Sequence, residues 1–353
     1  MTTIKTNPHR AVDYSESGVK KALAAAGSLE AEVKYDGVRL NLPVFPTGET
    51  QWLSRESKEL PALSHLSNPA SRQHEGVVTR ADDWRWFLKQ AGHEISGLMI
   101  DGEVMVKGVD FNTSSGLIRT KWLKPDNLKF NDVKFDEMPR KSTGAKSKLP
   151  FLLSPELIQV VVYGVIDLNV ILDPKAEGPI HSVTRLKAEA IVPLLQKYFP
   201  EIDWALSESH TVYDLESLNS LYEEKRLEGH EGLVVKDPLG KYKRGKKSGM
   251  WKMKPSEEAD GHVVRPVWGT EGLANEGLVI GFDVMLENGM EVSATNISRA
   301  LMSEFTENVK SDPDYYKGWA CQITYMEETP DGSLRHPSFC QWRGTEDNPT
   351  VKV

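Results

Sequence analysis

The chain has 353 residues, a length that fits two domains better than one. Hydrophobic residues make up 39% and charged residues 27%, as in a globular protein, and no apolar run is long enough to span a membrane. The net charge of −8 argues against a protein that only coats nucleic acid, and the nine histidines lack the spacing of a structural zinc site.

The first predicted elements surround a short charged stretch. Residues 16–26, ESGVKKALAAA, have the pattern of a short helix. Residues 29–35, LEAEVKY, alternate apolar and charged side chains, as a half-buried strand does. An Asp-Gly turn signal follows, and the alternation then resumes. We therefore expect a hairpin that carries Glu32, Lys34 and Arg39.

Further strands and helices are predicted up to about residue 255. Residues 98–108 have the pattern of a strand with Asp101 and Glu103 on one face, and residues 157–168 are apolar on both faces, as in a central strand. Helical spacing covers residues 182–199 and 212–228, and short strands follow at 231–237 and 250–255. This mixture predicts an α+β core.

The pattern changes after the acidic stretch near residues 255–260. Strands joined by Asn-Gly and Asp-Gly turns dominate the rest of the chain, with one helix at 297–309. About five strands in this length are typical of a small Greek-key barrel. We therefore expect two domains, 1–257 and 258–353, and we expect Cys321 and Cys340 to be reduced core thiols.

Several predicted strands carry charged side chains that folding alone does not explain. Lys34 lies beside Glu32, Asp101 beside Glu103, and Lys252 beside Lys254, while Glu231 begins another strand. Buried charges are costly unless they are paired, so a shared cleft of this composition indicates a polyanionic ligand and a divalent metal ion. The phosphate-binding sequence GxxxxGK[ST] is absent from the chain, which indicates a nucleotide site of another kind.

A lysine in such a cleft can act as a nucleophile. Its ordinary pKa is near 10.4, and neighbouring cations and a metal ion favour the free amine. Attack of that amine on an α-phosphate would expel pyrophosphate and form a phosphoramidate.

The motif KYDGVR, residues 34–39, resembles the KxDGxR nucleophile motif of the covalent nucleotidyltransferases. Further motifs follow in the order typical of that family: LSRES, IDGEVMV, VVYGVIDL, EGLVVKD and WKMKP. The chain as a whole resembles the compact ATP-dependent DNA ligases of T-seven-like bacteriophages. This resemblance implies an ATP-grasp-like adenylation domain of antiparallel sheets with helices, followed by an all-β OB-fold.

The resemblance also implies roles for individual residues. Lys34 would be the catalytic residue that carries AMP, and Glu103 and Glu231 would bind Mg²⁺ or Mn²⁺, with the ribose as an alternative ligand of Glu103. Asp36 and Asp101 are expected to be structural, and Tyr163 would stack on adenine or belong to the core. The residues expected to bind ATP are Glu32, Lys34, Tyr35, Arg39, Arg55, Glu103, Tyr163, Lys252 and Lys254.

The implied function is the sealing of nicks in duplex DNA by a monomer, in the cytoplasm of an infected bacterial host. Basic stretches at 119–148 and 241–247 are candidates for contact with DNA phosphates. The last family motif is atypical, with Arg335 and Arg343 near its place. The alternatives are an RNA ligase or a capping guanylyltransferase of the same superfamily, or a non-catalytic nucleic-acid-binding OB protein.

Overall fold

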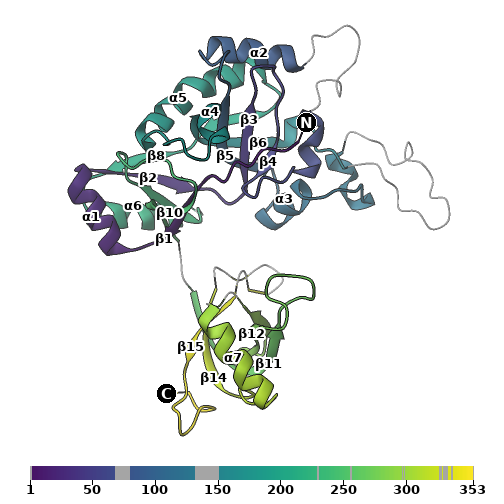
Figure 1. Ribbon diagram of the computed structural model, residues 1–353, viewed down its shortest axis with the longest axis vertical. Helices are drawn as coiled ribbons and strands as arrows, with labels where there is room; N and C mark the ends of the chain where they lie inside the picture. The colour runs from purple at the N-terminus through teal and green to yellow at the C-terminus, as the bar shows by residue number, and fades with distance from the viewer. Residues whose placement is uncertain are drawn as a thin grey trace, which may run out of the picture. The chain divides into compact units, whose positions relative to one another are not determined.

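The structure, a computed structural model, divides the chain into two compact units, Met1–Met253 and Lys254–Val353 (Figure 1). The expected boundary at 257/258 lies shortly after this division. The residues that the structure describes are 2–67, 80–131, 151–228, 230–254, 257–295, 297, 299–325, 328, 333–334 and 337–352.

The first unit contains two five-stranded sheets, and it confirms the predicted α+β class. Both sheets are antiparallel except for the β1·β10 and β6·β7 pairs, which are parallel. One sheet has the order β1 (His9–Asp13), β10 (Gly245–Met253), β9 (Gly232–Lys236), β2 (Leu29–Lys34) and β8 (Ser209–Val212). The other has the order β4 (Leu53–Ser54), β3 (Val38–Val44), β5 (Leu98–Val106), β6 (Ile158–Asp167) and β7 (Asp203–Leu206).

The predicted hairpin of β2 and β3 is wrong, because the two strands belong to different sheets. β2 pairs with β8 and β9, whereas β3 pairs with β4 and β5. Alternation along a strand defines its two faces but not its neighbours, so the sequence pattern could not reveal this crossing. The Asp36-Gly37 step therefore carries the chain from one sheet to the other.

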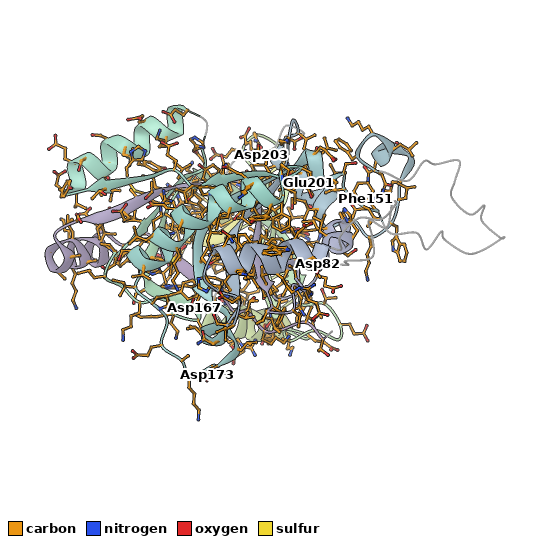
Figure 2. All side chains as sticks on the ribbon, turned by 90° about the horizontal axis from the view of Figure 1, so that it is seen from above. Asp82, Phe151, Asp167, Asp173, Glu201 and Asp203 are labelled. Atoms are coloured by element: carbon orange, nitrogen blue, oxygen red, sulfur yellow. The ribbon has the colours of Figure 1, made fainter. Side chains whose placement is uncertain are left out.

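Helices cover the outer face of each sheet of the first unit. Buried side chains of α1 (Glu16–Ala26) and α6 (Leu215–Leu227) form one core with β2, β9 and Trp251. On the second sheet, α5 (His181–Tyr198) packs against β6 and β7, and α2 (Arg80–Gln90) packs against α5. Asp167, at the end of β6 (Figure 2), binds Lys187 of α5 at 2.7 Å and so ties this helix to the sheet. The remaining helical segments in the described part of this unit are α3 (Phe111–Ile118), α4 (Leu168–Leu172) and 3₁₀ turns at Pro61–Ser67, Pro125–Phe130 and Pro155–Leu157.

The N-terminal strand β1 was not predicted from the sequence. It pairs with β10 and brings His9 into the interior, where its ring stacks on His181 with 5.1 Å between the ring centroids. Tyr242 lies edge-on to His9 at 5.8 Å. The first residues of the chain are therefore part of the core that supports β10.

Among its described residues, the second unit has the predicted five strands and single helix. Its strands form one antiparallel sheet, and the ring of Phe282 packs against Phe305, Tyr316 and Trp342 in its core. Cys321 is buried, as predicted, but Cys340 is exposed, so the prediction that both are core thiols is half wrong. The elements are β11 (Glu257–Trp268), β12 (Val279–Leu286), β13 (Glu291–Ala294), α7 (Arg299–Ser311), β14 (Ala320–Tyr325) and β15 (Ser338–Trp342), with the sheet order β13-β12-β11-β14-β15.

In the part of the chain that the structure describes, every helix is too short or too polar to cross a membrane.

The buried histidine pair predicts a pH-dependent stability. Burial lowers the pKa of His9 to about 4 and that of His181 to about 2. Both rings have a pKa of about 6.5 in the unfolded chain, so unfolding takes up protons below that pH and the stability falls as the pH falls through 6.5. His181→Phe should therefore reduce the loss of unfolding free energy between pH 7 and pH 5 by about 2 kcal/mol. Denaturant titrations at both pH values test this, and an unchanged pH dependence would contradict an uncharged buried ring.

Candidate active site

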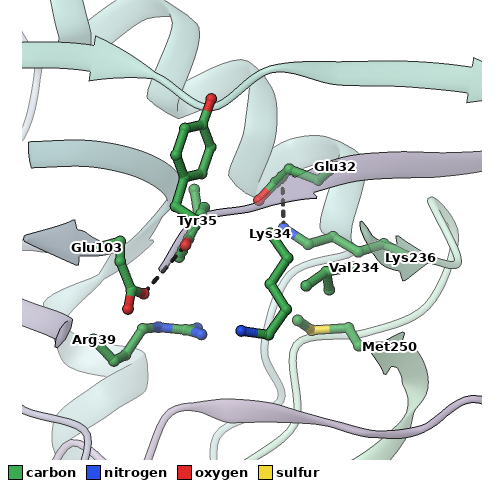
Figure 3. Close-up of a pocket in the computed structure, with 9 residues that line it drawn as sticks. Glu32, Lys34, Tyr35, Arg39, Glu103, Val234, Lys236 and Met250 are labelled. Carbon is green, nitrogen blue, oxygen red and sulfur yellow. Dashed lines mark hydrogen bonds and ion pairs between the residues drawn. The ribbon is translucent and has the colours of Figure 1, made fainter. Parts of the chain in front are cut away.

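A pocket lies where the two sheets of the first unit meet. Strands β2, β9 and β10 form one side, and strands β3, β5 and β6 form the other (Figure 3). The structure thus brings together six of the predicted site residues, and it adds three that sequence reasoning missed. The lining residues are Glu32, Lys34, Tyr35, Arg39, Glu103 and Tyr163, with Val234, Lys236 and Met250 as the additions.

Lys34 is the last residue of β2, and its amine points into the pocket toward Arg39 (Figure 3). The Nζ atom forms an ion pair with Glu231, which directly precedes β9. β2 and β9 are neighbours in register, with Lys34 opposite Gly232, so this pairing follows from the sheet itself. The Glu231 side chain is 7% exposed and that of Lys34 is 25% exposed, so the lysine keeps access to a ligand.

Arg39 is held rigidly by a buried carboxylate. Its Nε and Nη2 atoms donate to the two oxygens of Asp101 at 2.6 and 2.8 Å. Asn41 and Tyr242 donate to the same carboxylate at 3.0 and 3.1 Å. Asp101 is 2% exposed, so it acts from behind the pocket and orients Arg39. This bidentate geometry suits a guanidinium that must keep one orientation toward a ligand.

Glu103 and Tyr163 form the opposite wall of the pocket. The Tyr163 hydroxyl donates to Glu103 at 3.1 Å, and the Arg39 guanidinium lies 5.1 Å from the centre of the Tyr163 ring. Burial raises the pKa of Glu103 to about 7, although Arg39 and Lys34 oppose this shift. A nearby divalent cation would favour its charged form, as the metal-binding role implied for this carboxylate requires.

Glu32 and Lys236 form a second ion pair inside the pocket. Lys236 donates to Glu32 at 2.8 Å, and its Nζ atom lies 5.6 Å from the centre of the Tyr163 ring. Lys236 was missed, although in EGLVVKD it shares a strand face with Val234 while Leu233 and Val235 face the core. Tyr35 completes this end of the pocket, and its hydroxyl accepts a hydrogen bond from the backbone N–H of Glu208 at 3.2 Å.

Three predicted site residues of the first unit do not line the pocket: Glu231, which is ion-paired with Lys34, and also Arg55 and Lys252. Arg55 is exposed and pairs with its neighbour Glu56 at 3.2 Å. Lys252 lies on β10 and binds Asp13 of β1 at 2.9 Å. Lys252 and Lys246 lower the pKa of Asp13 to about 2, so this carboxylate stays charged at neutral pH. Lys252 would have to leave Asp13 to bind a phosphate.

Three other candidates belong to the second unit. Lys254 is the first residue of that unit. Arg343 pairs with Asp260 at 3.2 Å, within the unit itself. Arg335 lies outside the described residues.

The pocket has carboxylates for a metal ion but not a complete set of ligands. Over the described residues, no three His, Cys, Asp or Glu side chains converge as a metal site. Glu103 and Glu231 nevertheless fit a divalent cation that takes its other ligands from phosphates and water, as Mg²⁺ commonly does.

The Asp101–Arg39 pair predicts a large loss of stability when the carboxylate is neutralised. Asp101→Asn leaves the buried guanidinium without its counter-charge and should lower the unfolding free energy of the first unit by about 3 kcal/mol. The exposed Asp203 (Figure 2), which binds only Gln159 at 3.2 Å among the described residues, gives the matched control. Asp203→Asn should cost less than about 0.5 kcal/mol. Equal costs in denaturant titrations would show that Asp101 does not hold Arg39.

Comparison with known proteins identifies relatives over the whole chain. The sequence profile described as "ATP dependent DNA ligase domain" matches residues 11–254, and that described as "DNA ligase C-terminal domain" matches residues 255–314 and 311–343. DNA ligases of Escherichia phage T7 and Enterobacteria phage T3 are each 52% identical over 100% of both chains. The solved structure of the ATP-dependent DNA ligase from bacteriophage T7 in complex with ATP is 48% identical, with a TM-score of 0.62. It covers 96% of this chain and 99% of its own.

Proposed function

The chain belongs to the ATP-dependent DNA ligase family, and from this premise we propose how its pocket residues carry out the reaction. It seals nicks in duplex DNA through the lysine–AMP intermediate that is general in this family. The location of the Lys34 amine in the pocket, next to Glu231 and facing Arg39, is the observation that supports the assignment of the nucleophile.

In the first step, the Lys34 nitrogen attacks the α-phosphorus of ATP. The free amine attacks, the N–P bond forms while the bond to pyrophosphate breaks, and the proton that Nζ then gives up passes to solvent, to which the side chain has access. Because Lys34 is ion-paired with Glu231, that pair must loosen before the amine can attack. Arg39, held by Asp101, does not have to reorient when charge develops on the phosphate, and this preorganisation is what stabilises a transition state.

The other pocket residues bind the nucleotide. The polarizable face of Tyr163 suits stacking on adenine, and Glu32 and Lys236 offer an acceptor and a donor to the base edge. Lys252 lies on β10, in the same sheet as Lys34, and its ammonium group can bind the phosphates once it leaves Asp13. Tyr35 borders the pocket.

Glu103 and Glu231 would hold Mg²⁺ or Mn²⁺. When bound, the ion supplies positive charge that offsets the phosphate charge and disfavours the ammonium form of a nearby lysine. Glu231 pairs with Lys34 and would have to give up this ion pair before the amine can attack.

In the two later steps, AMP passes from Lys34 to the 5′-phosphate at the nick, and the 3′-hydroxyl then attacks that phosphate and releases AMP. We assign these steps to a monomer that acts in the cytoplasm of an infected bacterium. Sealing requires little sequence readout, so most contacts are expected to be with backbone phosphates.

Two basic stretches differ in how many free cations they offer to DNA. In 241–247, Lys241 binds Glu177, Lys246 binds Asp13, and Arg244 donates to backbone carbonyls in and after α4, which leaves two exposed cations, Lys243 and Lys247. The described part of the other stretch, residues 119–131, has exposed side chains at Arg119, Lys121, Lys124 and Lys129, against a single acidic residue, Asp126. The second stretch is therefore the stronger candidate for a DNA phosphate contact.

The nucleophile assignment is tested by the mass of the protein after incubation with ATP and Mg²⁺. The native chain should gain one AMP on Lys34, and Lys34→Ala should gain none and lose nick sealing by more than about 10³-fold, because no other amine occupies this position. Asp203→Asn serves as the control and should gain AMP normally. A Lys34→Ala protein that still seals nicks from ATP would refute the assignment.

The DNA contact is tested by salt dependence. Replacing Arg119, Lys121 and Lys124 with glutamine should weaken nick binding and reduce the slope of log affinity against log salt by about 2 to 3, near one for each DNA phosphate that no longer binds a cation. Glutamine at the exposed Lys89, Lys197 and Lys310 gives a control with the same change in total charge. Equal effects of the two triple substitutions would contradict a local contact.

A further inference from the structure

A buried lysine lies outside every motif discussed above. Lys225 is on α6, and it is only 5% exposed. Its Nζ atom contacts the carboxylates of Glu208 at 2.8 Å, Glu228 at 2.8 Å and Glu224 at 3.4 Å. Hydrogen bonds with Glu208 and Glu228 raise the pKa of Lys225, so it remains an ammonium ion at neutral pH. We refer to Lys225 and these three glutamates as the Lys225 cluster.

Glu208, Glu224 and Glu228 are 41%, 60% and 44% exposed, so solvent screens part of their mutual repulsion, whereas the ammonium group at the centre is buried. A buried ammonium needs one well-placed carboxylate, and additional carboxylates bring mutual repulsion. Three glutamates around one lysine leave the cluster with a net charge of −2 before its neighbours are counted. His210 lies 2.7 Å from Glu208, and His230 lies 3.8 Å from Glu228. The lysine is thus the central cation of a group of acidic side chains that would otherwise separate.

Glu208 connects the cluster to the residues on either side of Lys34. Its backbone carbonyl accepts a hydrogen bond from the N–H of Val33 at 2.9 Å, and its backbone N–H donates to the Tyr35 hydroxyl at 3.2 Å. The segment that Lys225 binds through Glu208 therefore fixes the backbone before the nucleophile and the side chain after it.

Glu228 connects the cluster to the segment that carries the partner of Lys34. The backbone N–H of His230 donates to the carbonyl of Lys225 at 3.0 Å, and Glu231 follows directly. The His230 ring also lies edge-on to the Tyr35 ring, with 5.9 Å between the centroids. One ammonium group thus joins the segment around Lys34 to Glu228 and, through the helix that carries it, to His230 and Glu231.

We propose that Lys225 is a positioning residue that holds the segment of Lys34 and the segment of Glu231 together, so that both side chains stay at the pocket where ATP is attacked. This inference rests on the proposed function, in which Lys34 is the nucleophile. Without the central cation, Glu208 and Glu228 repel each other, and the two segments that they anchor move apart. This movement should slow the transfer of AMP from ATP to the Lys34 amine. Sealing of a nick that already carries AMP on its 5′-phosphate does not use that amine as a nucleophile.

The test compares these two reactions in Lys225→Met, which keeps the length and apolar volume of the side chain but removes its charge. Single-turnover adenylylation of Lys34 should slow by about tenfold or more, whereas sealing of a pre-adenylylated nick should change by less than about twofold. Lys225→Arg should retain most of the adenylylation rate. Lys20→Met, which removes a lysine from the exposed Glu16 pair, is the matched control and should alter neither reaction.

A second variant separates repulsion from a general loss of folding. In Lys225→Met combined with Glu228→Gln, one of the repelling charges is gone, so adenylylation should recover by several-fold relative to Lys225→Met alone. Equal slowing of both reactions, an unaffected adenylylation rate, or no recovery in the double variant would each overturn the proposal. If the native protein does not adenylylate Lys34 at all, the proposed function fails. If the native protein adenylylates Lys34 and the Lys225 variants do so at the same rate, the proposed function stands and only this inference fails.

Discussion

The close approach of Gly37 to strand β5 determines where the active site forms. A Cβ atom at this position would lie 2.6 Å from Met105 Cγ and 2.7 Å from Glu103 Cγ, so any larger residue would push the chain away. Because the chain can pass here, it leaves one sheet after Lys34 and enters the other before Arg39. Lys34 and Arg39, the proposed nucleophile and the proposed phosphate-binding residue, consequently face each other across a pocket (Figure 3).

Charge pairing keeps this pocket stable before a nucleotide binds. Lys34 is paired with Glu231, Lys236 with Glu32, and Arg39 with Asp101. The ion pairs differ in how freely the cation can leave its partner. The Asp101 carboxylate accepts four hydrogen bonds, so Arg39 is fixed, whereas Lys34 has a single carboxylate partner among those described and can exchange it. A fixed cation suits preorganised binding of phosphate, and an exchangeable partner suits an amine that must lose its proton.

The sequence predicts the parts of this site better than their assembly. The motif around Lys34, the strands with Glu103 and Tyr163, and the five-stranded second unit all follow from periodicity and from the resemblance to a family. Strand neighbours depend on contacts between distant segments, which is why β2 and β3 were predicted to pair although they do not. The N-terminal strand β1 lacks a strong alternating pattern, so neither the strand nor its pairing with β10 could be predicted from the sequence. Lys236 could have been predicted as a pocket residue, because the alternation along its strand places it on the same face as Val234.

The central claim is that the Lys34 amine meets the α-phosphate of ATP inside the pocket between the two sheets. A crystal structure of the protein after reaction with ATP tests it most directly. The account predicts a bond from Lys34 Nζ to the phosphorus of AMP, with the adenine ring against Tyr163 and the phosphate beside Arg39. AMP attached to another residue, or bound outside the cleft between β2 and β5, would contradict it.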